Sequence, residues 1–230
     1  MKIAFRLMLA VCILLPVLSA ATAGAQGQEI KLPLPSGTGK VCVEAALLGV
    51  KSVRDFSPTP LTPAQVSQIL WSANGNLPAD AVSGATYKVI PSAGGRYSLE
   101  VFLVTGKDTV PGVSAGAYSY KPETNSLQLS VEGDHRTALS QACLSQMWLA
   151  KAPALVVIAA AFPRMTARYG NRGMQYVFME AGNSNQNVYL QCAALGLHTA
   201  TVGAFNDNQV ASVLKLPPGV TPVLVMAVGK

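Results

Sequence analysis

Residues 154–161 read Ala-Leu-Val-Val-Ile-Ala-Ala-Ala, a run that contains no polar side chain. The run is too short for a typical buried helix, and its branched residues favour extended backbone. A strand without any polar residue belongs inside a sheet rather than at its edge. Residues 154–161 therefore predict the central strand of the fold.

The segments on either side of this strand predict helices. Residues 137–150 precede it, and residues 176–197 are long enough for a major buried helix that ends at Gly196. Residues 40–50 also show a helix-like apolar pattern.

A further helix is predicted after Thr62, which is followed by Pro63 in a pairing typical of a helix start. Four apolar residues then fall on one helical face, and Gly75 marks the end. They are Val66, Ile69, Leu70 and Ala73.

Several segments alternate apolar and polar residues as strands do. Residues 97–104 form one, residues 116–120 and 126–131 predict a hairpin, and short strands are expected at 199–203 and 222–228 with a helix at 206–214 between them. Because helices and strands are mixed without a regular β-α-β repeat, the predicted fold class is α+β.

The beginning of the chain predicts export. Residues 1–25 combine two basic residues, an uncharged apolar run and small residues, which is the layout of a cleavable signal peptide. The apolar run is too short for a permanent membrane anchor. We expect an extended arm at 26–39, a single domain at 40–230, and a location outside the cytoplasm, in the bacterial periplasm.

Composition excludes some classes of partner. Charged residues make up 12% of the chain, so much of its surface is expected to be buried in a core or against a second subunit. The chain lacks a cluster of basic residues interleaved with aromatics, so its sequence does not indicate nucleic-acid binding. Two histidines and no paired cysteine spacing make a zinc site unexpected. If an exported chain forms a disulfide, Cys42 with Cys143 is the expected pair, leaving Cys192 free.

Three short motifs have competing interpretations. Residues 36–40 resemble a phosphate loop but lack the strand before it and the Ser or Thr after the lysine. Residues 112–116 match the Gly-x-Ser-x-Gly elbow around Ser114, so a serine hydrolase remains an alternative, although a strand-like segment follows where the elbow requires a helix. His135 and His198 are expected to be solvated loop residues.

Four segments contain residues suited to a phosphorylated ligand. Lys51, Ser52 and Arg54 place two cations and a hydroxyl near a helix end, where they could hold a phosphate dianion. The small-residue turn at 88–95 and the segment 203–205 offer backbone amides to a flat ring. Lys230 ends the chain.

These segments, in their order and spacing, resemble the nitroreductase superfamily, and within it the SagB-type branch of thiazoline and oxazoline dehydrogenases. The resemblance covers residues 41–230. The stretches that carry it are SVRDFSPTPLT, LWSANGN, PSAGG, GAYSYKPETNSLQL, LAKAPALVVIAA, YVFMEAGNSNQNVYLQCAALGLHTATVGAF and VMAVGK.

The resemblance implies a nitroreductase-like fold with a mainly antiparallel sheet flanked by helices. It also implies a homodimer that binds two FMN molecules at the subunit interface, each touched by both chains. Ser52 and Arg54, with Lys51 beside them, and Lys230 would bind the FMN phosphate. The isoalloxazine ring would be lined by Pro91, Ser92, Ala93 and Gly94. Its reactive edge would lie against Gly203 and Ala204, and Asn187 would sit at the dimer core.

The resemblance further implies an FMN-dependent oxidoreductase that passes hydride between two small molecules in ping-pong fashion, with no catalytic side chain of its own. NAD(P)H would serve as a donor in vitro, and the physiological donor and substrate stay open. A noncatalytic flavin-binding protein of the same fold is an alternative. Val50 and Gly95 depart from residues common in the family, an arginine and an asparagine, and residues 165–174 are the expected pocket cover.

Overall fold

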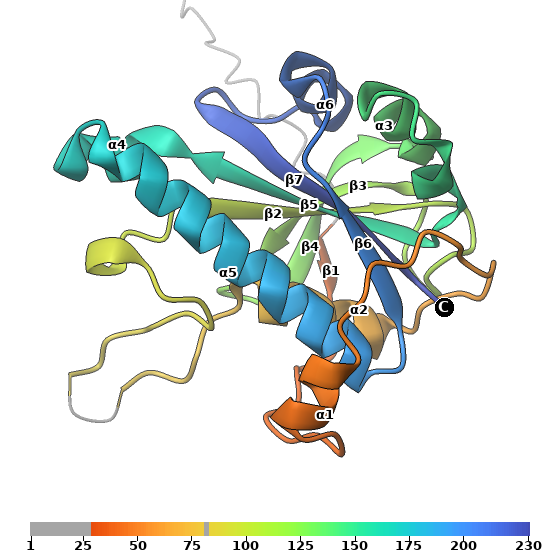
Figure 1. Cartoon of the computed structure of the whole chain (residues 1–230), viewed down its shortest axis with the longest axis horizontal. Coiled ribbons are helices and arrows are strands. Elements are labelled where there is room, and N and C mark those ends of the chain that lie inside the picture. Colours follow the sequence, from red (N-terminus) through yellow and green to blue (C-terminus); the bar gives the residue numbers. More distant parts are fainter. Residues whose placement is uncertain (1–28, 81–82) are drawn as a thin grey trace, which may run out of the picture.

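A seven-stranded antiparallel sheet forms the centre of the computed structural model, which describes residues 29–80 and 83–230 (Figure 1). The strand order is β1-β4-β3-β2-β5-β7-β6, and every neighbouring pair is antiparallel. The predicted α+β class is confirmed. The expected signal peptide at residues 1–25 lies outside the described residues.

The strands alternate with helices along the chain in no regular β-α-β order. The strands are β1 Glu29–Lys31, β2 Leu99–Thr105, β3 Gly116–Lys121, β4 Ser126–Glu132, β5 Ala154–Ala161, β6 His198–Val202 and β7 Val220–Gly229. The helices are α1 Val43–Leu48, α2 Pro63–Asn74, α3 Arg136–Ala142, α4 Phe162–Tyr169, α5 Arg172–Ala194 and α6 Asp207–Leu214, with short 3-10 turns at Ala93–Gly95 and Met147–Lys151.

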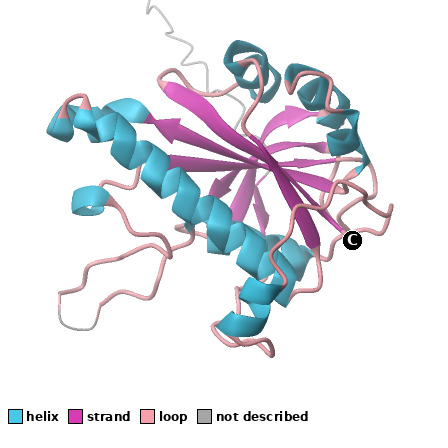
Figure 2. Ribbon diagram, viewed as in Figure 1, coloured by secondary structure: helices cyan, strands magenta, loops and turns pink. Residues whose placement is uncertain are grey.

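Helices cover the sheet on both faces (Figures 1 and 2). The long helix α5 and α2 pack on one face, while α3 and α6 pack on the other. α4 precedes α5 and packs against it, and α1 contacts the opposite end of α5. None of the helices among the described residues is long and apolar enough to cross a membrane.

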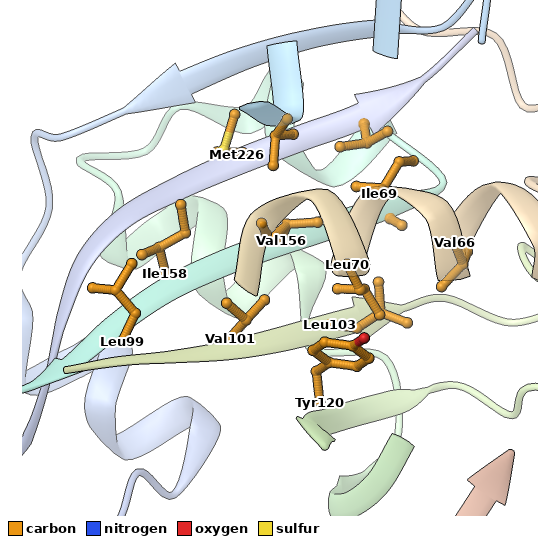
Figure 3. Close-up of a cluster of buried hydrophobic side chains, with 14 of the residues drawn as sticks. Val66, Ile69, Leu70, Leu99, Val101, Leu103, Tyr120, Val156, Ile158 and Met226 are labelled. Carbon is orange, nitrogen blue, oxygen red and sulfur yellow. The ribbon is translucent and has the colours of Figure 1, made fainter. Parts of the chain in front are cut away.

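Strand β5 confirms the prediction of a central strand at residues 154–161. It lies between β2 and β7, and its side chains alternate between the two cores. Val156 and Ile158 belong to the core that α2 and α5 cover, which Figure 3 shows together with Leu70 and Leu99. Leu155 and Val157 face the core under α3 and α6, and all four are fully buried.

The start of α2 also agrees with its sequence signals. The Gln65 amide donates to the Thr62 hydroxyl at 3.2 Å, and the Gln65 side chain accepts from the Thr62 amide at 2.9 Å. This capping box satisfies backbone amides that a helix start leaves unpaired. Gly75 follows the last helical residue, as expected.

Other elements differ from the expected ones. The helix expected over 137–150 is interrupted, because Leu144 and Ser145 adopt left-handed backbone with φ of 55° and 60°. The arm expected at 26–39 contributes β1, which pairs with β4. His198 lies in β6 rather than in a loop, and α5 begins at Arg172, four residues earlier than expected.

The expected disulfide between Cys42 and Cys143 is not present. Cys42 is exposed just before α1, which contacts α5, whereas Cys143 is buried in the core on the other face of the sheet. Cys192 is buried and free, as expected. Burial raises the pKa of the Cys143 thiol to about 11 and that of Cys192 to about 12, so both stay protonated and unreactive.

The packing of α2 on the sheet determines how much stability is lost when a buried side chain of α2 is shortened. Leu70 is fully buried in the core between the sheet, α2 and α5, whereas Leu34 is 88% exposed. We expect Leu70→Ala to lower the free energy of unfolding by about 2–5 kcal/mol, because it removes buried methyl groups and leaves a cavity. Leu34→Ala should change it by less than about 0.5 kcal/mol. Urea unfolding of both variants measures the difference, and equal costs would contradict the packing described here.

Candidate functional site

The segment before α2 is held at one end of the two last strands. Ser52 forms a parallel bridge with Thr199 at the start of β6, and the Val53 amide donates to the Thr199 carbonyl at 3.0 Å. The Ser57 amide donates to the Lys230 carbonyl at 2.6 Å. Two predicted site segments, 51–54 and the chain end, are therefore brought together.

The side chains at this end of β6 form a cationic group. Lys51, Ser52, Arg54 and Lys230 are all exposed, and the Arg54 guanidinium lies 5.6 Å from the centroid of the Trp148 ring. In the described part of the chain, no carboxylate forms an ion pair with any of these three cations. Three positive charges without an ion-paired carboxylate, together with a hydroxyl, are a donor set that can bind a phosphate dianion.

Tyr189 of α5 is a residue of this site that the sequence did not reveal. Its hydroxyl accepts from the Thr201 amide at 3.2 Å and shares a 2.8 Å hydrogen bond with the Ser52 hydroxyl. The Thr201 hydroxyl donates in turn to Asn185 at 2.5 Å. These contacts fix Ser52 relative to both α5 and β6. They join residues far apart in the chain, so no local pattern announces them.

Gly203 and Ala204 lie at the far end of β6 from Ser52. Both are exposed, and the atom nearest to a side chain placed at Gly203 would be a Leu224 methyl at 3.9 Å. The five residues of β6 separate the two ends by about 15 Å. Along this strand the molecule thus presents cations at one end and an open, unobstructed backbone at the other.

The turn containing Ser92 is organised by a buried carboxylate. Glu180 of α5 is 2% exposed and accepts hydrogen bonds from the hydroxyl of Ser92 and from the amide and hydroxyl of Ser98, the latter two at 2.9 and 2.7 Å. The Ser92 hydroxyl also accepts from the Tyr97 amide at 2.8 Å. The sequence did not single out Glu180, which fixes the conformation of this turn.

Gly94 is required by the same turn. It has a φ of 59°, and a side chain there would come within 2.4 Å of the Tyr169 hydroxyl. The turn residues and α5 enclose a pocket of about 200 Å³, whose α5 wall is made by Tyr176, Met179, Glu180 and Asn183.

Lys88, at the start of this segment, points toward α2. Its ammonium group donates to the Asn74 carbonyl at 3.1 Å and lies 5.9 Å from the centroid of the Tyr97 ring. Burial lowers the pKa of Lys88, because the charged form loses hydration. Its contacts attach the turn to α2.

The two groups of site residues lie on opposite flanks of α5. The 91–94 turn contacts Glu180, whereas Ser52 contacts Tyr189. Nine residues separate the two α5 positions, which corresponds to about 13 Å along the axis and half a turn around it. The structure therefore joins 51–54, Lys230 and β6, but places the 91–94 turn elsewhere.

Other predicted residues have structural roles or lack the required context. The Asn187 amide donates to the carbonyls of Ser72 and Val89 at 3.1 and 3.3 Å, so it connects α5 to neighbouring backbone. Ser114 lies in a loop that leads into β3 rather than into a helix. The His135 ring bonds to the Glu132 carbonyl at 2.8 Å. This arrangement disfavours the hydrolase alternative.

Comparisons with known proteins identify relatives of this chain. The model of the nitroreductase family matches residues 49–230. A Methanocaldococcus jannaschii protein named as a nitroreductase, MJ1384, is 39% identical over 204 residues, which are 89% of this chain and 98% of the relative.

Solved structures share the fold. A protein from Ralstonia eutropha described as a nitroreductase is 27% identical, with a TM-score of 0.74 over 90% of this chain and 91% of that one. A chain of the microcin synthetase McbBCD complex of Escherichia coli, solved with truncated pro-MccB17 bound, has a TM-score of 0.66 at 20% identity. The match covers 97% of this chain and 84% of that chain.

The hydroxyl of Tyr189 can be tested alone. We expect Tyr189→Phe to lower the free energy of unfolding by about 1–2 kcal/mol, because the Thr201 amide and Ser52 lose a partner. Tyr87→Phe is the control, since Tyr87 is 51% exposed. Urea unfolding measures both variants. A Tyr189→Phe protein as stable as its control would show that the hydroxyl does not support the site.

Proposed function

This chain belongs to the nitroreductase family, and we propose on that premise that it is an FMN-dependent oxidoreductase. Its similarity to a microcin synthetase chain supports the expected SagB-type branch. The observation that carries the proposal is the group of Lys51, Ser52, Arg54 and Lys230, which comes from two chain segments that meet at one end of β6.

These residues fit the cofactor chemically. The FMN phosphate is a dianion, and the cationic group supplies three positive charges with a hydroxyl held by Tyr189. The isoalloxazine ring is flat and needs open backbone, which Gly203 and Ala204 offer about 15 Å away at the other end of β6. Lys51 compensates for the arginine that many family members have at the position of Val50.

A homodimer accounts for the separation of the two groups of site residues. The outward face of α5 exposes Met174, Phe178 and Met179, with exposures of 47%, 53% and 56%. Apolar surface of this kind favours association. We propose that a second copy covers this face, so that the 91–94 turn of one protomer lines the flavin held by the cationic group of its partner.

When bound, FMN would supply the two-electron hydride chemistry. The protein residues then bind and orient. Ser52, Arg54 and Lys230 would hold the phosphate, and Gly203 and Ala204 would offer their amides to the ring. Glu180 fixes the conformation of the 91–94 turn, which would pack on the ring. No side chain needs to act as nucleophile or general base.

Export, which we propose from residues 1–25, limits where FMN is taken up and which electron donors are available. A chain that crosses the membrane unfolded takes up FMN afterwards, and it works where nicotinamide nucleotides are scarce. We therefore propose a periplasmic donor other than NAD(P)H, with NAD(P)H serving in vitro.

The cofactor proposal predicts a yellow protein. Purified protein should bind FMN with a flavin absorbance spectrum, and Arg54→Gln should weaken binding by about tenfold, because a charge-assisted bond to the phosphate is lost. Lys107→Gln, on the loop after β2, should leave the affinity unchanged. Quenching of FMN fluorescence measures the dissociation constants.

Turnover separates an enzyme from a flavin-binding protein. The FMN-loaded protein should reduce a quinone or nitroaromatic steadily when a chemical or nicotinamide reductant is supplied. A protein that never acquires a flavin spectrum contradicts the cofactor proposal. One that binds FMN but does not turn over supports the noncatalytic alternative.

The dimer proposal predicts that a charge on α5 separates the subunits. Phe178→Asp should convert a dimer into a monomer in analytical ultracentrifugation, because a carboxylate would be buried in an apolar interface. It should also weaken FMN binding, since the partner's turn is lost. Gln141→Glu, on exposed α3 across the sheet, is the control. A monomeric wild-type protein would contradict the proposal.

A further inference from the structure

We infer that the substrate of this enzyme is a small anion, guided by arginines that surround the 91–94 turn. The inference rests on the proposed function. These arginines, which we call the arginine rim, are Arg96, Arg168 and Arg172. They come from the turn itself, from α4 and from the start of α5, which Figure 1 shows together at one end of the molecule.

Arg168 and Arg172 are attached directly to the walls of the turn and its pocket. The Arg168 guanidinium carbon lies 5.4 Å from the Tyr169 ring centroid and 3.5 Å from the place where a Gly94 side chain would begin. The Arg172 guanidinium carbon lies 5.6 Å from the ring centroid of Tyr176, which lines the pocket.

The aromatic rings that carry these two arginines support each other. Tyr169 and Tyr176 meet edge to face, with ring centroids 5.1 Å apart and planes at 85°. Arginines that rest on packed rings keep fewer rotamers than free surface arginines do. The two guanidinium groups are therefore arranged in advance around the pocket, rather than scattered at random in solvent.

Arg96 extends the rim on the other side of the turn. Its side chain donates to the Arg164 carbonyl at 3.3 Å. Arg164 itself is neutralised, because it donates to Glu100 at 2.6 Å as well as to the Tyr97 carbonyl at 2.7 Å. The backbone carbonyl of Arg164 thus anchors Arg96, but the side chain of Arg164 is paired with Glu100 and is not part of the rim.

The rim carries uncompensated charge. Across residues 29–80 and 83–230, no carboxylate forms an ion pair with Arg96, Arg168 or Arg172. The nearby Glu180 is buried beneath the turn and is engaged by Ser92 and Ser98. Three exposed positive charges beside a pocket attract an anion and offer guanidinium forks to a carboxylate or phosphate. The substrate class indicated is an organic acid or phosphate ester carrying the redox-active group.

Binding of unreactive analogues tests the inference on FMN-loaded protein. Benzoate and phenyl phosphate should each perturb the bound flavin spectrum with a dissociation constant about tenfold lower than that of neutral benzamide. The advantage should decline between about 20 mM and about 500 mM salt, because exposed charges are screened. A preference for only one of the two anions identifies carboxylate or phosphate as the recognised group.

Variants locate the effect. The double variant Arg168→Gln with Arg172→Gln should lose most of the advantage of the anions, while the affinity for benzamide stays within about twofold. Arg168→Lys with Arg172→Lys should retain much of it. The control is the double variant Lys107→Gln with Lys151→Gln, which removes two charges at the opposite end of the sheet. It should retain the full affinity advantage of the anions over benzamide.

Stopped-flow kinetics extend the test to the reaction. The rates at which 4-nitrobenzoate and 4-nitrobenzamide oxidise the reduced protein are compared, with free reduced FMN as the reference for their intrinsic reactivity. Equal binding of benzoate and benzamide by the wild-type protein overturns the inference, as does equal loss of the anion preference in the control variant. Failure to bind FMN would instead overturn the proposed function.

Discussion

The structure depends on the burial of one strand from both sides. Every residue of β5 except the last is buried, and its side chains alternate between two separate cores. Water cannot reach either face, so helices must cover both, and each of its Val, Leu and Ile side chains contributes about 1.5–3 kcal/mol when fully buried. The remaining strands extend from this centre by antiparallel pairing.

Helix α5 positions two groups of residues on this covered sheet, the 91–94 turn and Ser52. Toward the sheet it is apolar, but Glu180 and Tyr189 introduce polar atoms at two flanks. Each is paired with backbone amides or hydroxyls, as buried polar groups require. Glu180 fixes the 91–94 turn, and Tyr189 fixes the side chain of Ser52. Because these residues lie on opposite flanks, the dimer that we propose would combine the 91–94 turn of one protomer with the cationic group of the other.

The charges of the molecule are few and unevenly placed. Lys51, Arg54 and Lys230 gather at one end of β6, and the arginine rim gathers near the start of α5. In a chain with 12% charged residues, uncompensated cations at two places suggest two anionic ligand groups. The first suits the phosphate of the proposed cofactor, and the second suits the molecule with which it reacts. This division leaves the chemistry to the cofactor.

Local patterns in the sequence determined much of the fold. The apolar run at 154–161, the Thr62 cap and the hairpin around residues 121–125 each depend on neighbours a few positions away, so the elements could be predicted from their own residues. The break at Leu144 and the extra helix α4 were missed, because packing selected backbone conformations that local preference does not specify. The residues of the cationic group, Lys51, Ser52, Arg54 and Lys230, could also be singled out from the sequence, and their proposed role in binding phosphate stays a prediction. Only the tertiary structure decided that Tyr189 supports Ser52, that Glu180 holds Ser92 and that Cys42 and Cys143 lie on opposite sides of the sheet. These contacts join residues distant in the chain, and their geometry exists only once the sheet and α5 have packed together.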